Sequence, residues 1–455
     1  MDSIVALATP PGHSALAIIR ASGPEVGTFL KRLANRNSFQ PRHATLADLH
    51  DPSTGEKIDH CVVQFFPSPH SYTGEDLCEI SCHGSPVLIS RLLEAVLHLG
   101  ARLAEPGEFT LRAFLNGKMD LAQAEAVRDL VDARTEYQAR IAREQLEGKL
   151  SAALQPLKQK LVDVISFLET AVEFVEDDVG EISRSAQAEN LQQICQDLQK
   201  MEASYSFGRF IHDGFQLAII GRPNVGKSSL FNALLQSDRA IVTEIPGTTR
   251  DLITESMHVE GVPVRLIDTA GIRSSSDRIE QIGIERSHQA AGDADVLLVV
   301  LDATSPVTSE DEELLKRLQS QPGIVVWNKI DLAEPQQATV GRRPAVDKEA
   351  IHISKVSALK GEGLNELRQS IHRLLSQNAI AGQQGIIVTN LRHKICMAQT
   401  RVALEEGCRA LRENLSEEFA LYHIRSGLQR LGEITGETTV EDILDNIFST
   451  FCIGK

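Results

Sequence analysis

The sequence predicts an α/β protein with an added all-helical part, and three observations support this. Between about Phe215 and Leu375, apolar strand-like runs alternate with helical stretches, which is the pattern of a parallel sheet covered by helices. The segments on either side of this block have helical composition, with apolar residues at helical spacing. The first 118 residues mix short strands with helices. These observations predict an N-terminal α+β domain followed by an α/β domain inserted into a discontinuous helical domain.

The length and the charge balance agree with this division. A chain of 455 residues corresponds to about three domains at ~150 residues each. The formal net charge of −16 disfavours a dedicated nucleic-acid coat protein. Half of that surplus falls within residues 119–213, which hold 18 acidic and 10 basic residues. The predicted domains are 1–118, 119–213 (first helical part), 214–378 (inserted domain) and 379–455 (second helical part).

The cysteines and the hydropathy indicate the cellular compartment of the protein. Seven cysteines scattered along a long chain do not form a disulfide framework, which favours a reducing cytoplasm. No apolar run reaches the ~18 residues needed to cross a bilayer, and the first residues lack a basic signal region. We therefore expect a soluble cytoplasmic protein that has no membrane partner.

Local patterns place the elements in order along the chain. Residues 16–19 and 61–66 are strand-like, and 86–99 is helical. Residues 121–176 predict long amphipathic helices, whose charged positions are most simply a solvated face. Near-continuous apolar runs predict four buried parallel strands. These strands are Phe215 to Ile220, Val264 to Ile267, Val296 to Leu301 and Ile324 to Trp327, with a further strand-like stretch from Ala350 to Ile353.

A phosphate-binding motif, GxxxxGK[ST], occupies residues 221–228, between a predicted strand and a predicted helix. Its glycines let backbone N–H groups turn inward around phosphates, and the helix N-terminus favours negative charge there. Lys227 is expected to reach the β- and γ-phosphates, and Ser228 to bind Mg²⁺. The motif and its context favour a nucleotide site over a chance glycine-rich turn.

A second motif, Asp268-Thr269-Ala270-Gly271, ends the strand that precedes it. This position allows Asp268 to hold the magnesium, directly or through water, and the Gly271 N–H to sense the γ-phosphate. Thr249 in the loop between the two motifs is the candidate for the second magnesium hydroxyl.

Two more motifs predict which nucleotide base the site binds. Asn328-Lys329-Ile330-Asp331 follows a buried strand, and a carboxylate there accepts hydrogen bonds from guanine N1–H and N2–H₂ that adenine does not offer. Ser357, Ala358 and Leu359 complete the predicted base pocket. The ordered series resembles the translation-factor-related class of small GTPases. The expected GTP contacts are residues 224–229 (Asn224, Val225, Gly226, Lys227, Ser228, Ser229), 243–249 (Thr243, Glu244, Ile245, Pro246, Gly247, Thr248, Thr249), 268–271, 328, 329, 331 and 357–359.

The position after Gly271 is Ile272, where signalling GTPases carry the glutamine that orients the attacking water. The water must therefore be oriented by another group. Acidic candidates in the following segment are Asp277, Glu280 and Glu285, each of which is also explained as an ordinary surface carboxylate.

The chain resembles, from end to end, the tRNA-modification GTPase family MnmE (TrmE). Beyond the GTPase motifs, the match rests on segments in the N-terminal domain and at the C-terminus. These are residues 8–12 (ATPPG), Arg20, 72–76 (YTGED), 83–84, 104–109 (AEPGEF), 112–118 (RAFLNGK), 120–125 (DLAQAE) and 451–455 (FCIGK).

This resemblance implies a function that composition does not show. Members of the family form homodimers and act with an FAD-dependent partner, MnmG (GidA), in a heterotetramer-type complex. Together they add an aminomethyl or carboxymethylaminomethyl group to C5 of the wobble uridine (position 34) of certain tRNAs. The N-terminal domain is expected to resemble tetrahydrofolate-binding domains, with 5-formyl- or methylene-tetrahydrofolate as the one-carbon donor. Matching positions place Arg20, Glu79, Lys118 and Lys455 in the folate pocket.

The resemblance also accounts for the absent glutamine. In similar GTPases a potassium ion sits where an arginine finger would, and it supports dimerisation of the two GTPase domains. Its ligands would be Asn224 with Thr243, Ile245 and Thr248. A fixed cation offsets charge developing between the phosphates. Glu280 falls where the family's water-positioning glutamate lies, so the expected catalytic residues are Glu280 and Lys227.

Two other functions remain open from the sequence. A GTPase switch of the ribosome-assembly type would act on RNA without covalent chemistry, but it would be expected to carry a basic RNA-binding appendage, and both flanks here are net acidic. A stand-alone folate enzyme with a regulatory GTPase is the third possibility. Cys452 is either a nucleophile or a small apolar residue, and no histidine lies near it in sequence.

Overall fold

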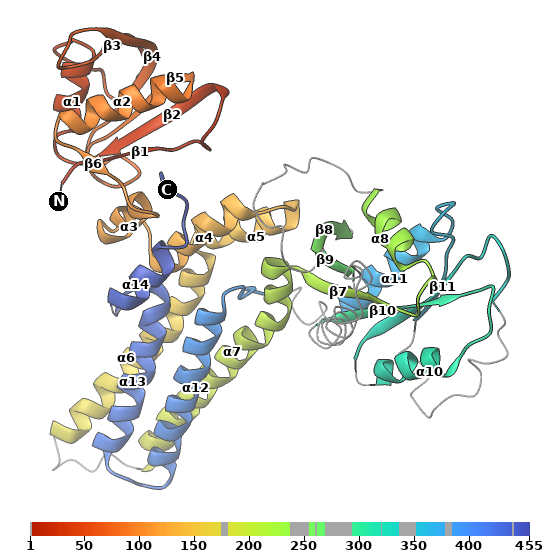
Figure 1. Ribbon diagram of the computed structural model, residues 1–455. Helices are drawn as coiled ribbons and strands as arrows, with labels where there is room; N and C mark the ends of the chain where they lie inside the picture. Colours follow the sequence, from red (N-terminus) through yellow and green to blue (C-terminus); the bar gives the residue numbers. More distant parts are fainter. Residues whose placement is uncertain are drawn as a thin grey trace, which may run out of the picture. The chain divides into compact units, whose positions relative to one another are not determined.

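The structure is a computed structural model that describes residues 2–173, 181–236, 254–259, 262–268, 294–319, 321–335, 352–377, 385–438 and 441–455 (Figure 1). The chain divides into two compact units. The first comprises residues 1–132, 142–192 and 402–455, and the second comprises residues 133–141 and 193–401. Each unit contains a six-stranded sheet in its described residues, so the predicted mixture of α/β, α+β and helical parts is confirmed.

The sheet of the first unit has the strand order β3-β4-β5-β2-β1-β6. Its neighbouring strands run antiparallel except for the parallel pair β1 and β6. Buried and exposed residues alternate along β4, as period-two strands with one covered face require. The strands are β1 (Ile4–Leu7), β2 (Ser14–Ser22), β3 (Thr45–His50), β4 (Lys57–Phe66), β5 (Leu77–Gly84) and β6 (Arg102–Leu103).

Two helices, α1 (Val26–Leu33) and α2 (Pro86–His98), supply the rest of that domain's apolar core. The predicted strand-like segments 16–19 and 61–66 lie inside β2 and β4, and the helix predicted over 86–99 is α2. These local predictions are therefore confirmed.

The helical part is assembled from chain segments on both sides of the inserted domain, as the sequence predicts. In the first unit, α6 packs against α13, and a row of leucines on α6 is buried. The C-terminal α14 and the residues after it pack on α3 and α4 through Phe448, Phe451, Leu121 and Val127. The helices are α3 (Glu108–Leu115), α4 (Leu121–Asp132), α5 (Glu136–Leu146), α6 (Lys149–Glu173), α7 (Glu181–Asp213), α12 (Leu391–Arg412), α13 (Glu417–Thr435) and α14 (Glu441–Phe448).

The sheet of the second unit has the order β12-β11-β10-β7-β9-β8, with β8 antiparallel and the other pairs parallel. Separate apolar clusters cover its two faces, which explains why its strands are continuous apolar runs. The strands are β7 (Phe215–Ile220), β8 (Thr254–Val259), β9 (Val262–Asp268), β10 (Val296–Asp302), β11 (Gly323–Asn328) and β12 (His352–Lys355).

In its described residues this domain also has helices α8 (Lys227–Gln236), α10 (Ser309–Lys316) and α11 (Leu364–Gln377), with a short 3₁₀ turn at Arg317–Gln319. The four predicted strands coincide with β7, β9, β10 and β11 to within two residues at each end. The stretch predicted at 350–353 lies in part outside the described residues, and β12 begins at His352. Within the part of the chain that is described, no helix is both long and apolar enough to span a membrane.

Gly436 ends α13 with a left-handed backbone conformation, φ +85°. A Cβ placed there would lie 2.6 Å from the ring of Phe114 and 3.0 Å from Cβ of Leu121. The end of α13 therefore touches the domain that precedes it, and it can do so because this position has no side chain.

We expect Gly436→Ala to lower the unfolding free energy by about 2 kcal/mol or more, because left-handed strain of about 1 kcal/mol adds to the clash. Gly117→Ala is the matched control, because Gly117 also has a positive φ (+67°) but a Cβ added to it would have nothing within 4 Å. The shift of the urea midpoint should be clearly larger for Gly436→Ala. Equal shifts would contradict the close contact with Phe114.

Candidate functional site

The phosphate-binding loop lies between β7 and α8, at the carboxyl edge of the parallel sheet. Asn224 and Gly226 have positive φ angles, +64° and +95°. A Cβ on Gly226 would lie 2.2 Å from Nδ2 of Asn328, so a side chain cannot replace its hydrogen. The loop thus has the tight, inward-turned backbone that a phosphate group requires.

Lys227 begins α8 and folds back over the loop. Its Nζ donates to the carbonyl oxygens of Gly221 at 2.7 Å and Arg222 at 2.8 Å. Ser228 and Ser229 follow in the first turn of α8 and are exposed, whereas Val225 is buried. The loop, the lysine and the helix N-terminus therefore have the arrangement that suits a nucleotide phosphate with Mg²⁺.

The buried amide of Asn328 connects the base motifs to the phosphate loop. Its Nδ2 donates to the carbonyl of Val225 at 2.9 Å, and its Oδ1 accepts from the N–H of Ala358 at 3.0 Å. Lys329 adds bonds from Nζ to the carbonyl of Asn224 at 2.8 Å and to the carboxylate of Asp302 at 2.6 Å. The structure thus brings residues 224–226, 328–329 and 358 together.

The other predicted base contacts lie beside this junction. Ser357 is fully buried, and its hydroxyl accepts from the N–H of Lys360 at 3.2 Å. Leu359 is exposed, and Asp331 is partly exposed just after β11. An exposed apolar side chain such as Leu359 is suited to cover a planar base.

Several predicted nucleotide and metal contacts lie outside the described residues. They are Thr243, Glu244, Ile245, Pro246, Gly247, Thr248, Thr249, Thr269, Ala270, Gly271 and Glu280. Asp268 is described only as the last backbone position of β9, opposite Ile219 of β7. Among the residues that are described, no group of three or more His, Cys, Asp and Glu side chains could hold a metal.

A second group of polar side chains lies on the sheet of the first unit. Arg20 of β2 and Glu79 of β5 are directly paired in register. The Glu79 carboxylate accepts from Arg20 Nε at 3.1 Å and Nη2 at 2.7 Å. The Arg20 guanidinium also lies 5.5 Å from the ring centre of Tyr72 and 5.8 Å from that of Phe109, within the range of cation–π attraction.

The C-terminus reaches this pair. Nη1 of Arg20 donates to the carbonyl of Gly454 at 3.2 Å, which brings the neighbouring Lys455 to the same end of the sheet. Lys118 contacts the loop that carries Tyr72, donating from Nζ to the carbonyl of Pro69 at 3.0 Å. Arg20, Glu79 and the tail therefore meet, whereas Lys118 reaches the group through that loop.

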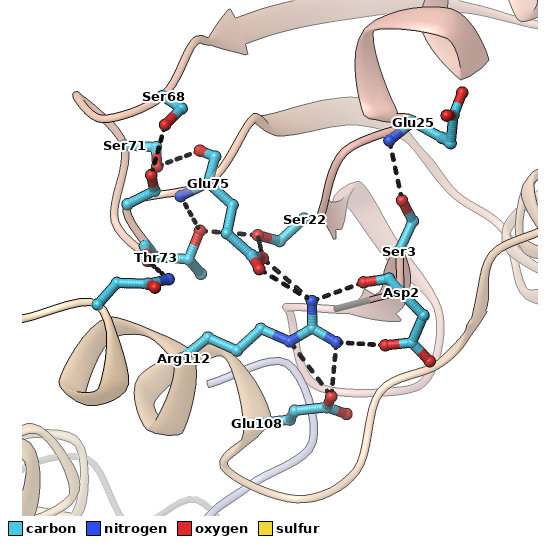
Figure 2. Close-up of polar contacts among 12 residues, drawn as sticks. Asp2, Ser3, Ser22, Glu25, Ser68, Ser71, Thr73, Glu75, Glu108 and Arg112 are labelled. Carbon is cyan, nitrogen blue, oxygen red and sulfur yellow. Dashed lines mark hydrogen bonds and ion pairs between the residues drawn. The ribbon is translucent and has the colours of Figure 1, made fainter.

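Arg112 lies at the centre of a neighbouring polar network, which Figure 2 shows. Only 3% of its side chain is exposed, and it bonds carboxylates from three separate segments. Asp2 accepts at 2.8 Å, Glu75 at 3.0 Å and Glu108 at 2.9 Å. Glu75 also accepts from Ser22 Oγ, on the strand that carries Arg20, at 2.8 Å.

The sequence did not single out this network, although Glu75 and Arg112 lie in the segments that carry the family resemblance. In the sequence, the network is visible only as single charged residues next to apolar ones, at positions 102, 108 and 112. A second guanidinium, Arg102, bonds Asp2 at 2.6 Å and Glu108 at 2.6 Å. The contacts join the first residues, a loop and α3, which are far apart along the chain, so sequence spacing does not reveal them.

The two guanidiniums alter the acid strength of the Asp2 and Glu108 carboxyl groups. Arg102, assisted by Arg112, lowers the pKa of Asp2 below its ordinary 3.8 despite some burial. Burial alone would raise the pKa of Glu108, but the bonds from Arg102, the Glu105 N–H and Arg112 outweigh it, and that pKa is lower than the ordinary 4.5. Both groups are therefore charged in the folded protein at neutral pH.

The cysteines differ in exposure. Cys452 is exposed, whereas Cys61, Cys78, Cys82, Cys195, Cys396 and Cys408 are buried. Burial raises the pKa of Cys82 to about 11 and that of Cys78 to about 12, so these thiols stay protonated.

The phosphate loop, the base motif that closes on it and the parallel sheet beneath them define the class of P-loop GTPases. Two family models place the chain more narrowly: "GTP-binding protein TrmE N-terminus" matches residues 3–118, and "MnmE helical domain" matches 121–452. The chain belongs to the MnmE (TrmE) family.

Curated relatives extend over the whole chain. The tRNA modification GTPase MnmE of Koribacter versatilis is 47% identical, covering 100% of this chain and 99% of that protein. The protein of the same name from Aquifex aeolicus is 44% identical, covering 100% of both. A crystal structure of Aquifex aeolicus Era bound to GDP and aluminium fluoride aligns with 41% of this chain and 66% of that chain, at 28% identity and a TM-score of 0.29. That superposition is too loose to add to the family assignment.

Acid should weaken the Asp2–Glu108 network. Because the folded pKa values of both carboxyls are below the ordinary 3.8 and 4.5, the stabilisation is complete above the ordinary values and is lost as the pH falls from them through the lower folded values. Arg102→Gln should therefore lower the unfolding free energy by about 1 kcal/mol at pH 7, and by less near pH 3.5.

Urea unfolding between pH 7 and 3.5 measures both effects. Arg91→Gln is the control, because Arg91 pairs with Glu56 and contacts neither carboxylate. A pH dependence of Arg102→Gln as steep as that of the unchanged protein would contradict the assigned role of Arg102.

Proposed function

We propose that this protein is the GTP-hydrolysing component of the system that adds a carboxymethylaminomethyl or aminomethyl group to C5 of the wobble uridine of certain tRNAs. The observation that carries the proposal is the full-length identity of 47% to a protein named tRNA modification GTPase MnmE. The same name recurs among relatives at 39–44% identity over the whole chain. The GTPase part rests in addition on the geometry of the phosphate loop and Asn328.

In this proposal the sheet edge of the second unit binds GTP. The backbone of 224–226 and Nζ of Lys227 surround the phosphates, and Ser228 and Thr249 hold Mg²⁺. Asp331 accepts the guanine edge, while the Asn328 amide fixes the loops around it. Glu280 orients the attacking water, and Asn224 with Thr243, Ile245 and Thr248 holds the potassium ion that stands in for an arginine finger.

The Arg20–Glu79 pair is the proposed folate site. Its donor set suits a reduced folate, which carries both a hydrogen-bonding ring edge and carboxylates. Glu79 fixes one edge of the Arg20 guanidinium and the two aromatic rings fix its plane, so the remaining N–H groups are held in one orientation. Lys118 and Lys455 add positive charge at the same end, and the bound folate would supply the one-carbon unit.

The remaining chemistry is assigned to partners. We propose a homodimer in the cytoplasm that works with the FAD-dependent MnmG protein and with tRNA. A net charge of −16 is unfavourable for direct phosphate-backbone binding, so the flavoprotein is proposed to supply much of the RNA affinity.

Potassium should accelerate GTP hydrolysis. We expect the unchanged protein to hydrolyse GTP at least about tenfold faster in potassium chloride than in sodium chloride, because a fixed cation offsets the charge that develops between the phosphates. Asn224→Ala should lose this difference, while Asn232→Ala, an exposed asparagine on α8, should keep it. Phosphate release measured in the two salts decides the matter, and equal rates for the unchanged protein would refute potassium dependence.

Nucleoside analysis of tRNA tests the biological role. A strain lacking this gene should lose the C5 group from its wobble uridines, and the unchanged gene should restore it. Arg20→Ala should fail to restore it, yet should hydrolyse GTP within about twofold of the normal rate, because no described contact joins Arg20 to the nucleotide motifs.

Mass spectrometry of digested tRNA gives the readout, with Arg91→Ala on α2 as the restoring control. Normal wobble nucleosides in the deletion strain would refute the proposed function. Full restoration by Arg20→Ala would refute only the assignment of the folate site.

A further inference from the structure

The phosphate loop contains an arginine whose side chain points away from the loop and into the body of the domain. Nε of Arg222 donates to Oδ1 of Asp311 at 2.7 Å, and Nη2 donates to Oγ of Ser305 at 3.2 Å. Ser305 lies between β10 and α10, and Asp311 lies in the first turn of α10. Arg222 thus ties the loop to a part of the fold that carries none of the GTPase motifs.

Asp311, the residue that anchors Arg222, is held rigidly. The Asp311 side chain is 1% exposed, and its second oxygen, Oδ2, accepts from the N–H of Thr308 at 3.0 Å and from its hydroxyl at 3.1 Å. The bond from the Thr308 N–H and the reciprocal bond from the Asp311 N–H to the Thr308 hydroxyl form the capping box that begins α10, so one carboxylate serves the helix and the loop at once. A buried carboxylate with both oxygens committed is a fixed acceptor and not a mobile surface charge.

The same region, residues 302–311, also anchors the other half of the loop. Asp302, at the end of β10, accepts from Nζ of Lys329, and that amine also bonds the Asn224 carbonyl. Arg222 therefore holds the beginning of the loop and Lys329 holds its middle. Residues 302–311 act as a common support behind both positions.

Two side chains hold the beginning of the loop. Nζ of Lys227 donates to the carbonyls of Gly221 and Arg222, which uses two of its three N–H groups. The Arg222–Asp311 pair uses none of these atoms, so it holds the loop whether or not a phosphate engages Lys227.

We propose that Arg222 is a positioning residue of the nucleotide site, anchored by Asp311, which slows nucleotide dissociation by keeping the first half of the phosphate loop in its binding conformation. Arg222 touches no reacting atom in this proposal. Its loss should weaken retention of GDP and GTP alike and leave the chemical step unchanged.

The experiment compares release of a fluorescent N-methylanthraniloyl GDP from the full-length protein and its variants. Arg222→Gln should raise the dissociation rate about tenfold and the KM for GTP by a similar factor, with kcat within about twofold of normal. Arg222→Lys should recover part of the loss, because an amine can reach one carboxylate oxygen but cannot form the forked contact. Asp311→Asn keeps an acceptor for Thr308 but removes the charge, so it should act in the same direction.

The double variant distinguishes coupling between Arg222 and Asp311 from a general destabilisation of the domain. If the two residues act through each other, Arg222→Gln combined with Asp311→Asn should release GDP no faster than the worse single variant. Arg209→Gln is the matched control, since Arg209 forms an ion pair of 2.7 Å with Asp295 in the same unit, just before the amino end of β10. It should release GDP at the normal rate.

Several outcomes would overturn the proposal. Normal GDP release from both Arg222→Gln and Asp311→Asn would do so, as would a fall in kcat with unchanged release, or additive effects in the double variant. If Arg222→Gln does not fold, as judged by circular dichroism, Asp311→Asn and Arg222→Lys decide the question. A failure of the unchanged protein to bind the fluorescent GDP would instead contradict nucleotide binding itself.

Discussion

The burial of α6 against α13 is the interaction on which the first unit depends. The two helices lie on opposite sides of the inserted domain in sequence, and five leucines of α6 at positions 150, 154, 157, 161 and 168 are buried. Their burial contributes of the order of 10 kcal/mol as an upper estimate. This packing brings the chain back to the N-terminal domain, because α13 is followed by Gly436 and then by α14, which packs on α3. From α14 the tail reaches the Arg20 guanidinium, so the proposed folate site is completed by residues more than 400 positions apart.

The sequence predicted the elements whose pattern of apolar and polar residues does not depend on which strand lies beside them. Strand β7 was located to the residue and β10 and β11 nearly so, because a parallel sheet covered on both faces needs continuous apolar runs. Strand β3 was not identified. It alternates apolar residues with Asp48, which pairs with Lys57 and His60 of β4, and such a residue is explained only once the partner strand is known. Asp59, for example, is a buried carboxylate that accepts from His83 on the adjacent strand at 2.8 Å.

The same distinction applies to the sites. The GTPase motifs are local and could be recognised from residue spacing alone. This includes Val225 and Ala358, which Asn328 connects by hydrogen bonds. Arg20 and Glu79 were proposed from resemblance, but their direct pairing follows from the register of β2 on β5, which no local pattern encodes. Arg112 and Arg222 were not proposed at all. Arg112 bonds carboxylates from three distant segments and Arg222 bonds Asp311, which is 89 positions away. An isolated arginine in a sequence is most often a surface cation.

The end of α7 and the strand that carries the phosphate loop form one rigid piece. A single residue, Gly214, separates them, with φ +79° and an N–H that donates to Phe210 at 3.0 Å. The rings of Phe210 and Phe215 stack at 4.0 Å with an angle of 11° between their planes. Stacked rings on both sides of a one-residue turn stabilise this junction by about 0.5–1.5 kcal/mol and oppose its bending. A displacement of the phosphate loop that moves β7 is therefore expected to move the end of α7 as well, because only Gly214 separates the two elements.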